Sequence, residues 1–72
     1  MKPLDLLQQS LHKPVLVELR GGRRIRGTLE SFDQHLNLVL SSAEEHDAKG
    51  ENPTPRPGIT LVRGDSVIFI SP

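Results

Sequence analysis

The 72-residue chain has no cysteine, tryptophan or tyrosine, and Phe32 and Phe69 are its only aromatic residues. Without cysteine, neither a disulfide framework nor a cysteine-based zinc site can form. Two aromatic rings are too few for a base-stacking sheet of the RNA-recognition-motif kind. The histidines His12, His35 and His46 show no paired metal-ligand spacing. We therefore expect no metal and no other cofactor.

The formal net charge is zero, which argues against binding of nucleic acid through bulk charge but leaves room for a local basic patch. The chain also lacks any apolar run near the roughly 18 residues of a transmembrane helix, and no secretory signal is evident. We expect a soluble, cytoplasmic protein with no membrane partner. A single domain of this size has a small core, so self-association is the remaining source of stability.

A short amphipathic helix is predicted over about residues 3–12. Pro3 suits a first helical turn, and Pro14 forbids continuation. Leucines recur between them at helical spacing, at positions 4, 6, 7 and 11. Because so short a helix is unstable alone, we expect its leucines to cover the core of a sheet or barrel.

From Val15 onward the apolar period changes from 3.6 to 2, which predicts strands. Gly21-Gly22 is a hairpin-turn signal, and Gly27 inside a strand indicates a sharp bend or a close backbone approach. Residues 42–58 are polar and proline-rich, which predicts an exposed loop into whose ends the adjoining strands can extend. Five strands are expected, at about 15–20, 23–32, 36–41, 59–62 and 67–70. Together with the helix they predict a mainly β, strongly bent open barrel, SH3-like or OB-like.

The last two strands have unprotected edges. Residues 67–70 are apolar at every position, which implies that both faces of this strand are covered. Neither 59–62 nor 67–70 carries the lysine or proline that usually blunts an edge. We therefore expect strand 59–62 of one copy to pair with strand 67–70 of the next, repeating until a ring closes.

Asp33, His35 and Asn37 alternate where a turn gives way to an apolar strand. In extended geometry they point to the same side, while Leu36 and Leu38 anchor the other side. This pattern indicates a small polar site on a hydrophobic base; the alternative is an ordinary polar turn.

Arg63-Gly64-Asp65 is a second candidate segment. A guanidinium can stack on a base and attract phosphate. The alternative is a tight turn with a local ion pair.

Two segments resemble the motifs of the Sm and Sm-like (LSm) family, archaeal type. The first runs from Val15 to Leu40 and carries family positions at Leu19, Gly22, Gly27, Leu29, Phe32, Asp33, His35, Asn37 and Leu38. The second is 59–70, with its Arg-Gly-Asp turn. With the helix they identify the chain as a single Sm-like domain over 1–72: helix about 3–12, first motif about 15–41, variable loop about 42–58, second motif about 59–70.

The resemblance implies the Sm fold, a helix followed by a five-stranded SH3-like open barrel. It implies a homo-oligomeric ring, which we expect to be a heptamer rather than a hexamer. It also implies that the ring binds single-stranded U-rich RNA at its central pore and acts as a chaperone or scaffold in RNA processing. In the family's terms, His35 and Arg63 would sandwich a base and Asn37 would bond its edge. Asp65 would orient Asn37 or Arg63, and the turns around the pocket would be shaped by Asp33 and Gly64.

Four arginines surround the Gly21-Gly22 turn and form a candidate second RNA contact, Arg20, Arg23, Arg24 and Arg26. The alternative is a solvated hairpin, partly neutralised by Glu18 and Glu30.

Two other functions compete with RNA binding. One is a protein-interaction ring in which RNA binding is incidental. The other is a nuclease using His35 with Asp33 or Asp65, which is disfavoured because no nucleophile, base and orienting group are suitably spaced.

Overall fold

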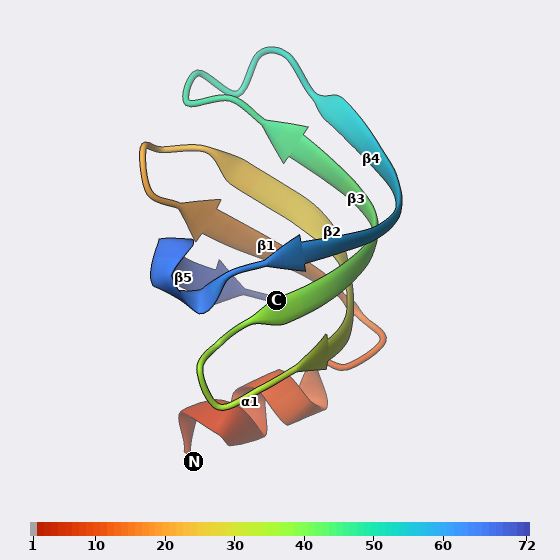
Figure 1. The fold of residues 1–72 in the computed structure, drawn as a ribbon, viewed down its shortest axis with the longest axis vertical. Helices are drawn as coiled ribbons and strands as arrows, with labels where there is room; N and C mark the ends of the chain where they lie inside the picture. Colours follow the sequence, from red (N-terminus) through yellow and green to blue (C-terminus); the bar gives the residue numbers. More distant parts are fainter. Residues whose placement is uncertain (1) are drawn as a thin grey trace.

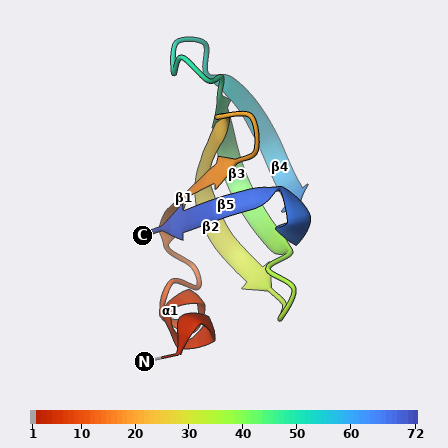
Figure 2. The same ribbon diagram turned by 90° about the vertical axis from the view of Figure 1, so that its left-hand side faces the viewer.

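Five antiparallel strands form one curled sheet with a short helix at one end (Figures 1 and 2). The structure is a computed structural model that describes residues 2–72, so that Met1 lies outside it. The elements are α1 (Pro3–Gln9), β1 (Pro14–Leu19), β2 (Arg24–Phe32), β3 (Leu38–His46), β4 (Thr54–Val62), the 3-10 turn η1 (Gly64–Ser66) and β5 (Val67–Ser71). The strand order is β4-β3-β2-β1-β5, so β4 and β5 are the edges. The predicted helix followed by a bent five-stranded sheet is confirmed.

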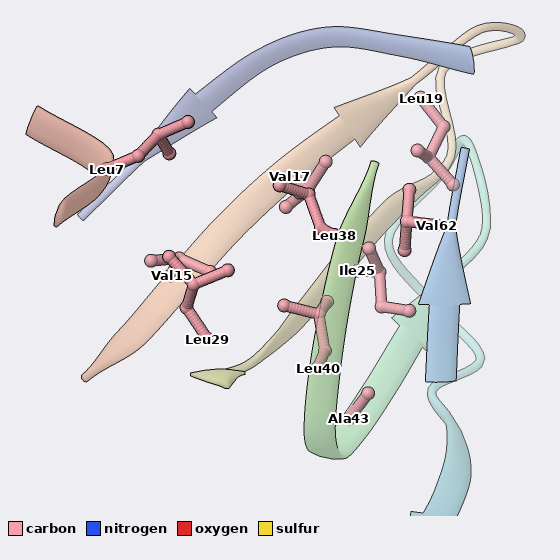
Figure 3. Packing of buried hydrophobic residues seen from close by; sticks show 10 residues of the cluster. All are labelled: Leu7, Val15, Val17, Leu19, Ile25, Leu29, Leu38, Leu40, Ala43 and Val62. Carbon is pink, nitrogen blue, oxygen red and sulfur yellow. The ribbon is translucent and has the colours of Figure 1, made fainter. Parts of the chain in front are cut away.

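The core lies on the concave side of the sheet and, within the described residues, contains no buried polar side chain. Figure 3 shows the buried residues converging from α1 and from the first four strands: Leu7, Val15, Val17, Leu19, Ile25, Leu29, Leu38, Leu40, Ala43 and Val62. They alternate along β1 and β2, as the period of 2 predicts. Fully burying a leucine or valine contributes about 1.5–3 kcal/mol, but the ten buried residues make only a small core.

The helix is shorter than the predicted 3–12, because it ends at Gln9. The next residues turn back toward the sheet. His12 donates its backbone N–H to the Leu29 carbonyl (2.7 Å), and Leu29 donates to Lys13 (3.0 Å). Pairing with β2 therefore draws residues 12 and 13 out of the helix. No helix in residues 2–72 is long and apolar enough to span a membrane.

Only part of the leucine stripe covers the core. Leu7 is buried, and Leu11 is half-buried against the same cluster. Leu4 and Leu6 stay exposed. Leu6, together with Leu36 and Ile70, borders a mainly apolar groove of about 230 Å³ beside α1. The helix thus covers the open end of the barrel with one side and leaves apolar surface on another.

The sheet bends along a line that crosses three strands. The pairing register shifts at Gly27 in β2 and at Ser42 in β3, where the chain of β4 passes through Gly58. Ser42 and Gly58 have positive φ angles of 50° and 79°. A shift of register of this kind increases the twist and curls a sheet. A sharp bend or a close backbone approach was predicted at Gly27, and the structure has both: the register shifts there, and the backbone passes close to Ser41 and Ala43.

Strands β3 and β4 reach further into the expected loop than the apolar pattern indicates. The segment between them is only 47–53, against the predicted 42–58. The bulge at Ser42 interrupts the period of 2 in β3, and prolines hide the strand character of β4. Sequence periodicity cannot show pairing of this kind, because it depends on the partner strand.

The edge of β4 has two different halves. Pro55 stands opposite Glu44 of β3, and a proline in a strand must turn its nitrogen away from the partner, because it has no N–H to donate. Pro55 and Pro57 therefore blunt the free edge over the first half of the strand. The expected open edge is confined to 59–62.

Exposed apolar side chains gather on the two edge strands. Ile59 and Leu61 of β4 are 67% exposed, and Ile68 and Phe69 of β5 are 56% and 45% exposed. The expectation that both faces of β5 are covered is wrong within one chain. These side chains are left for another molecule to cover.

We expect Gly27→Ala to destabilise the fold by about 1–3 kcal/mol, because a Cβ there would lie 3.1 Å from the Ser41 carbonyl oxygen and 3.2 Å from the Ala43 Cβ. Urea unfolding measures this. Thr28→Ala, one residue further along β2 on the opposite face, is the control and should cost under about 1 kcal/mol. Equal stability of the Gly27 variant and wild type would contradict the close approach.

Candidate nucleic-acid interface

Two loops that are far apart in the sequence meet at one corner of the barrel. Residues 33–37 connect β2 to β3, and residues 63–66 connect β4 to β5. The Gly64 backbone N–H donates to Asn37 Oδ1 over 2.8 Å. A Cβ on Gly64 would overlap the carbonyl oxygen of His35, so only glycine allows the two backbones to come this close.

Asp33 holds the first loop together. Its Oδ1 accepts the backbone N–H groups of His35 (2.8 Å) and Asn37 (3.1 Å), and its Oδ2 accepts the Asn37 side-chain amide (3.0 Å). The hydrogen bond from the Asn37 amide is the largest factor that lowers the pKa of Asp33 below its usual value. Asp33 is therefore ionised at neutral pH and orients Asn37 directly.

The loop closes as a turn. Asp33 accepts a backbone N–H from Leu36 over 3.1 Å and donates its own to the Asn37 carbonyl over 3.2 Å. Leu36 has a φ of 62°. The third strand therefore begins at Leu38 and not at the predicted Leu36, because the left-handed residue and the carboxylate of Asp33 close a turn first.

The predicted site residues lie on these two loops. His35, Arg63 and Asp65 are exposed, whereas Asn37 is half-buried. Arg63 Nη2 and Asp65 Oδ2 are 3.0 Å apart, so Asp65 orients Arg63. Of the two roles predicted for Asp65, the contact with Asn37 is wrong, because Asn37 bonds to Asp33 and Gly64 instead.

The two loops present complementary chemistry. An exposed imidazole and an exposed guanidinium offer flat surfaces for stacking, and a half-buried carboxamide offers both a donor and an acceptor. Together the 33–37 and 63–66 loops can receive a planar polar ring.

The four arginines around the Gly21-Gly22 turn do not form one basic cluster. Arg23 pairs with Glu45 (2.8 Å) and Arg24 pairs with Glu18 (3.2 Å). Arg20 and Arg26 have no ion pair within residues 2–72. Gly21 and Gly22 both have positive φ, as the predicted hairpin turn requires. The structure therefore leaves two arginine charges free here and not four.

Glu30 does not take part in the predicted neutralisation of the hairpin. Its carboxylate faces His12, with 3.4 Å between Oε1 and Nδ1. Only Glu18 of the two predicted acids meets the hairpin arginines.

Sequence reasoning assigned Asp33 and Gly64 only to the shaping of turns. It missed that they hold the amide of Asn37 from two sides. The four-residue spacing of Asp33 and Asn37 is a usable signal for the first contact, because aspartate readily accepts from the backbone just after it. The contact with Gly64 spans 27 residues and has no local signal.

Comparison with known proteins decides the family. A model of the LSM domain matches residues 5–72. The chain belongs to the LSM family. It is 48% identical over 71 residues to an snRNP Sm-like protein of Archaeoglobus fulgidus, in a match that covers 99% of this chain and 90% of the relative. The predicted family is thereby confirmed.

Solved structures of the LSM family share the fold. A heptameric archaeal Sm protein matches with a TM-score of 0.83 and 52% identity, over 94% of this chain and 96% of its own. The Sm protein of Pyrococcus abyssii in complex with a uridine heptamer matches with a TM-score of 0.85 and 41% identity, over 100% and 99%. The Sm fold predicted from the two motifs is confirmed.

We expect Gly64→Ala to separate the two loops and to lower the thermal midpoint, because the added methyl would overlap His35. Calorimetry measures the change. Gly50→Ala is the control, because it also replaces a loop glycine. A Cβ at Gly50 would meet no other atom, so that only the positive φ of 72° opposes the substitution. This conformation should cost about 1 kcal/mol of stability. A Gly64 variant no less stable than the control would contradict the junction.

Proposed function

We propose that this LSM-family chain assembles into a closed homo-heptameric ring that binds single-stranded U-rich RNA at the rim of its pore. We propose that it acts in the cytoplasm as a chaperone or scaffold in RNA processing, without catalysis of its own. The observation that carries the proposal is the likeness over the whole chain to the Sm protein that was solved with a uridine heptamer. The heptameric archaeal relative, 52% identical, supports the number of subunits.

The edge strands support assembly. β4 and β5 are the two free edges of one sheet, so β4 of one copy can pair with β5 of the next and bury the apolar side chains of both. The prolines in the first half of β4 restrict this pairing to 59–62. This head-to-tail contact leaves an edge free at each end until the ring closes.

The site geometry supports one base per subunit. His35 and Arg63 supply stacking surfaces, and the ion pair with Asp65 limits the positions that the guanidinium can take. Asn37 presents a donor and an acceptor, which match the O4 and N3–H of uracil. One such pocket binds weakly, since stacking contributes about 1–3 kcal/mol per base.

The ring raises the affinity of the weak pocket. Seven copies of a pocket around one axis can be filled by consecutive nucleotides of one strand, each at high effective concentration. A run of uridines then binds far more tightly than one uridine, and mixed sequences fill only some of the pockets.

The chemistry of Asp33 supports a role in binding and not in hydrolysis. Its carboxylate already accepts three hydrogen bonds, and its lowered pKa makes it a weak base. Residues 2–72 also contain no group of three or more histidines and acidic residues placed to hold a metal. A nuclease in which Asp33 accepts the proton is therefore disfavoured.

We expect tight binding of oligo-U and poor binding of oligo-A by fluorescence anisotropy at physiological salt, with Arg63→Ala weakening oligo-U binding about tenfold or more. Native mass spectrometry of the same samples should show an intact ring, because Arg63 is exposed and lies outside both edge strands. Arg56→Ala, which removes an exposed arginine from the first half of β4, outside both loops, is the control and should bind nearly as wild type. Equal weak binding of both RNAs on an intact ring would contradict the proposal and favour a protein scaffold.

We expect Leu61→Lys to dissociate the ring into smaller species, because it places a charge on the apolar surface of the open half of β4. Thr54→Lys lies in the half of the strand blunted by prolines and should leave the ring intact. Sedimentation at micromolar concentration distinguishes the two variants. A closed ring in the Leu61 variant would show that this surface is not the contact between subunits.

A further inference from the structure

Closing a ring through β4 and β5 leaves part of β4 without a partner strand. β4 has nine residues, whereas β5 has only five. β3 pairs with one side of β4, and the other side is a free edge of the sheet. When 59–62 pairs with β5 of the next copy, the first four residues of β4 (54–57, the unpaired half) still have a free edge. Ring closure therefore does not remove every edge of the sheet.

The unpaired half is open to other molecules. All four of its residues are exposed. In Figure 1 it belongs to the β3–β4 hairpin, which lies at the opposite end of the molecule from α1. Gly58, with a φ of 79°, stands between this half and the half that carries the exposed Ile59 and Leu61. Each copy in a ring would therefore present a short strand edge that a second ring can approach.

The outer edge of the unpaired half has acceptors but no donors. Pro55 stands opposite Glu44 of β3 and has no N–H, so its nitrogen points away from β3. The N–H and C=O of one strand residue point to the same side, and the side alternates along the strand. The carbonyls of Pro55 and Pro57 therefore both point outward. The N–H groups of Thr54 and Arg56 point toward β3.

A strand cannot pair with an edge of this kind, because antiparallel pairing exchanges donors and acceptors in both directions. We propose that Pro55 and Pro57 keep the assembly finite, by preventing the unpaired half of β4 from pairing with the same segment of a second ring. Two such segments can approach around a two-fold axis, and a ring would offer one from every subunit. The inference rests on the proposed function, because it takes the closed ring as given.

Charge repulsion between hairpins is the competing explanation for separate rings. The segment 42–58 has a net charge of −2, with four acidic and two basic residues: Glu44, Glu45, Asp47 and Glu51 against Lys49 and Arg56. Like charges oppose the approach of two copies, but salt screens this repulsion, and the screening length falls to about 3 Å in 1 M salt. The missing donors do not depend on salt. Measurements at high salt therefore isolate the effect of the prolines.

The test restores an N–H at both proline positions. Pro55→Val with Pro57→Val adds two outward donors and two β-branched side chains that favour strands. The matched control, Thr54→Val with Arg56→Val, adds the same two side chains at positions whose N–H groups already point toward β3. The two double variants thus differ in the direction of their backbone donors.

We expect wild type and the control to sediment as single rings in about 1 M salt. The Pro55→Val/Pro57→Val variant should sediment as two or more joined rings, in a proportion that rises with protein concentration. Hydrogen exchange at the new amides of residues 55 and 57 should slow about tenfold or more on association, because only a second ring can protect them.

The outcomes separate the two proposals. If native mass spectrometry finds no closed ring of wild type, the proposed function fails. If wild type forms the ring and the proline variant stays a single ring with rapidly exchanging amides, the inference is overturned. Equal association of both double variants, or association of wild type in high salt, overturns it as well. If the proline double variant does not form a ring, Pro57→Val alone replaces it and is judged by the same two measurements.

Discussion

The close approach of β2 and β3 at Gly27 is the constraint on which the rest of this structure depends. Glycine lets the backbone of β2 pass next to Ser41 and Ala43, where any side chain would be crowded. The sheet can then curl along the line that continues through Ser42 and Gly58. A flat sheet with the same strand order would hold its edge strands far apart and would leave its apolar face open.

The curl also brings the 33–37 and 63–66 loops together, and the candidate site exists only where they meet. Asn37 belongs to one loop and its acceptor oxygen is bonded to the other. Asp33 fixes the near side of the same amide. The site thus has a rigid, half-buried centre, while His35 and Arg63 remain exposed around it. A preformed donor and acceptor need little reordering when a ligand binds, which favours selectivity.

The small core and the exposed edges are two consequences of one architecture. A chain of 72 residues buries few apolar side chains. It leaves others exposed on β4 and β5, where a second copy could cover them. Prolines blunt only the first half of the β4 edge, so the half that is free to pair is also the half that carries Ile59 and Leu61. Stability, assembly and the repetition of a weak pocket around an axis would then follow from the same two strands.

The sequence by itself determined the order and type of the elements, the Gly21-Gly22 turn, the bend at Gly27 and the residues of both candidate loops, because these depend on local periodicity and on glycine and proline chemistry. The tertiary structure decided the early end of α1, the length of β3 and β4, and the separation of the four arginines, since each depends on a partner strand or a neighbouring acid. It also decided the role of Asp33. Asp33 holds one side of the Asn37 amide, and Gly64, 27 residues away, holds the other. No local pattern encodes the contact with Gly64.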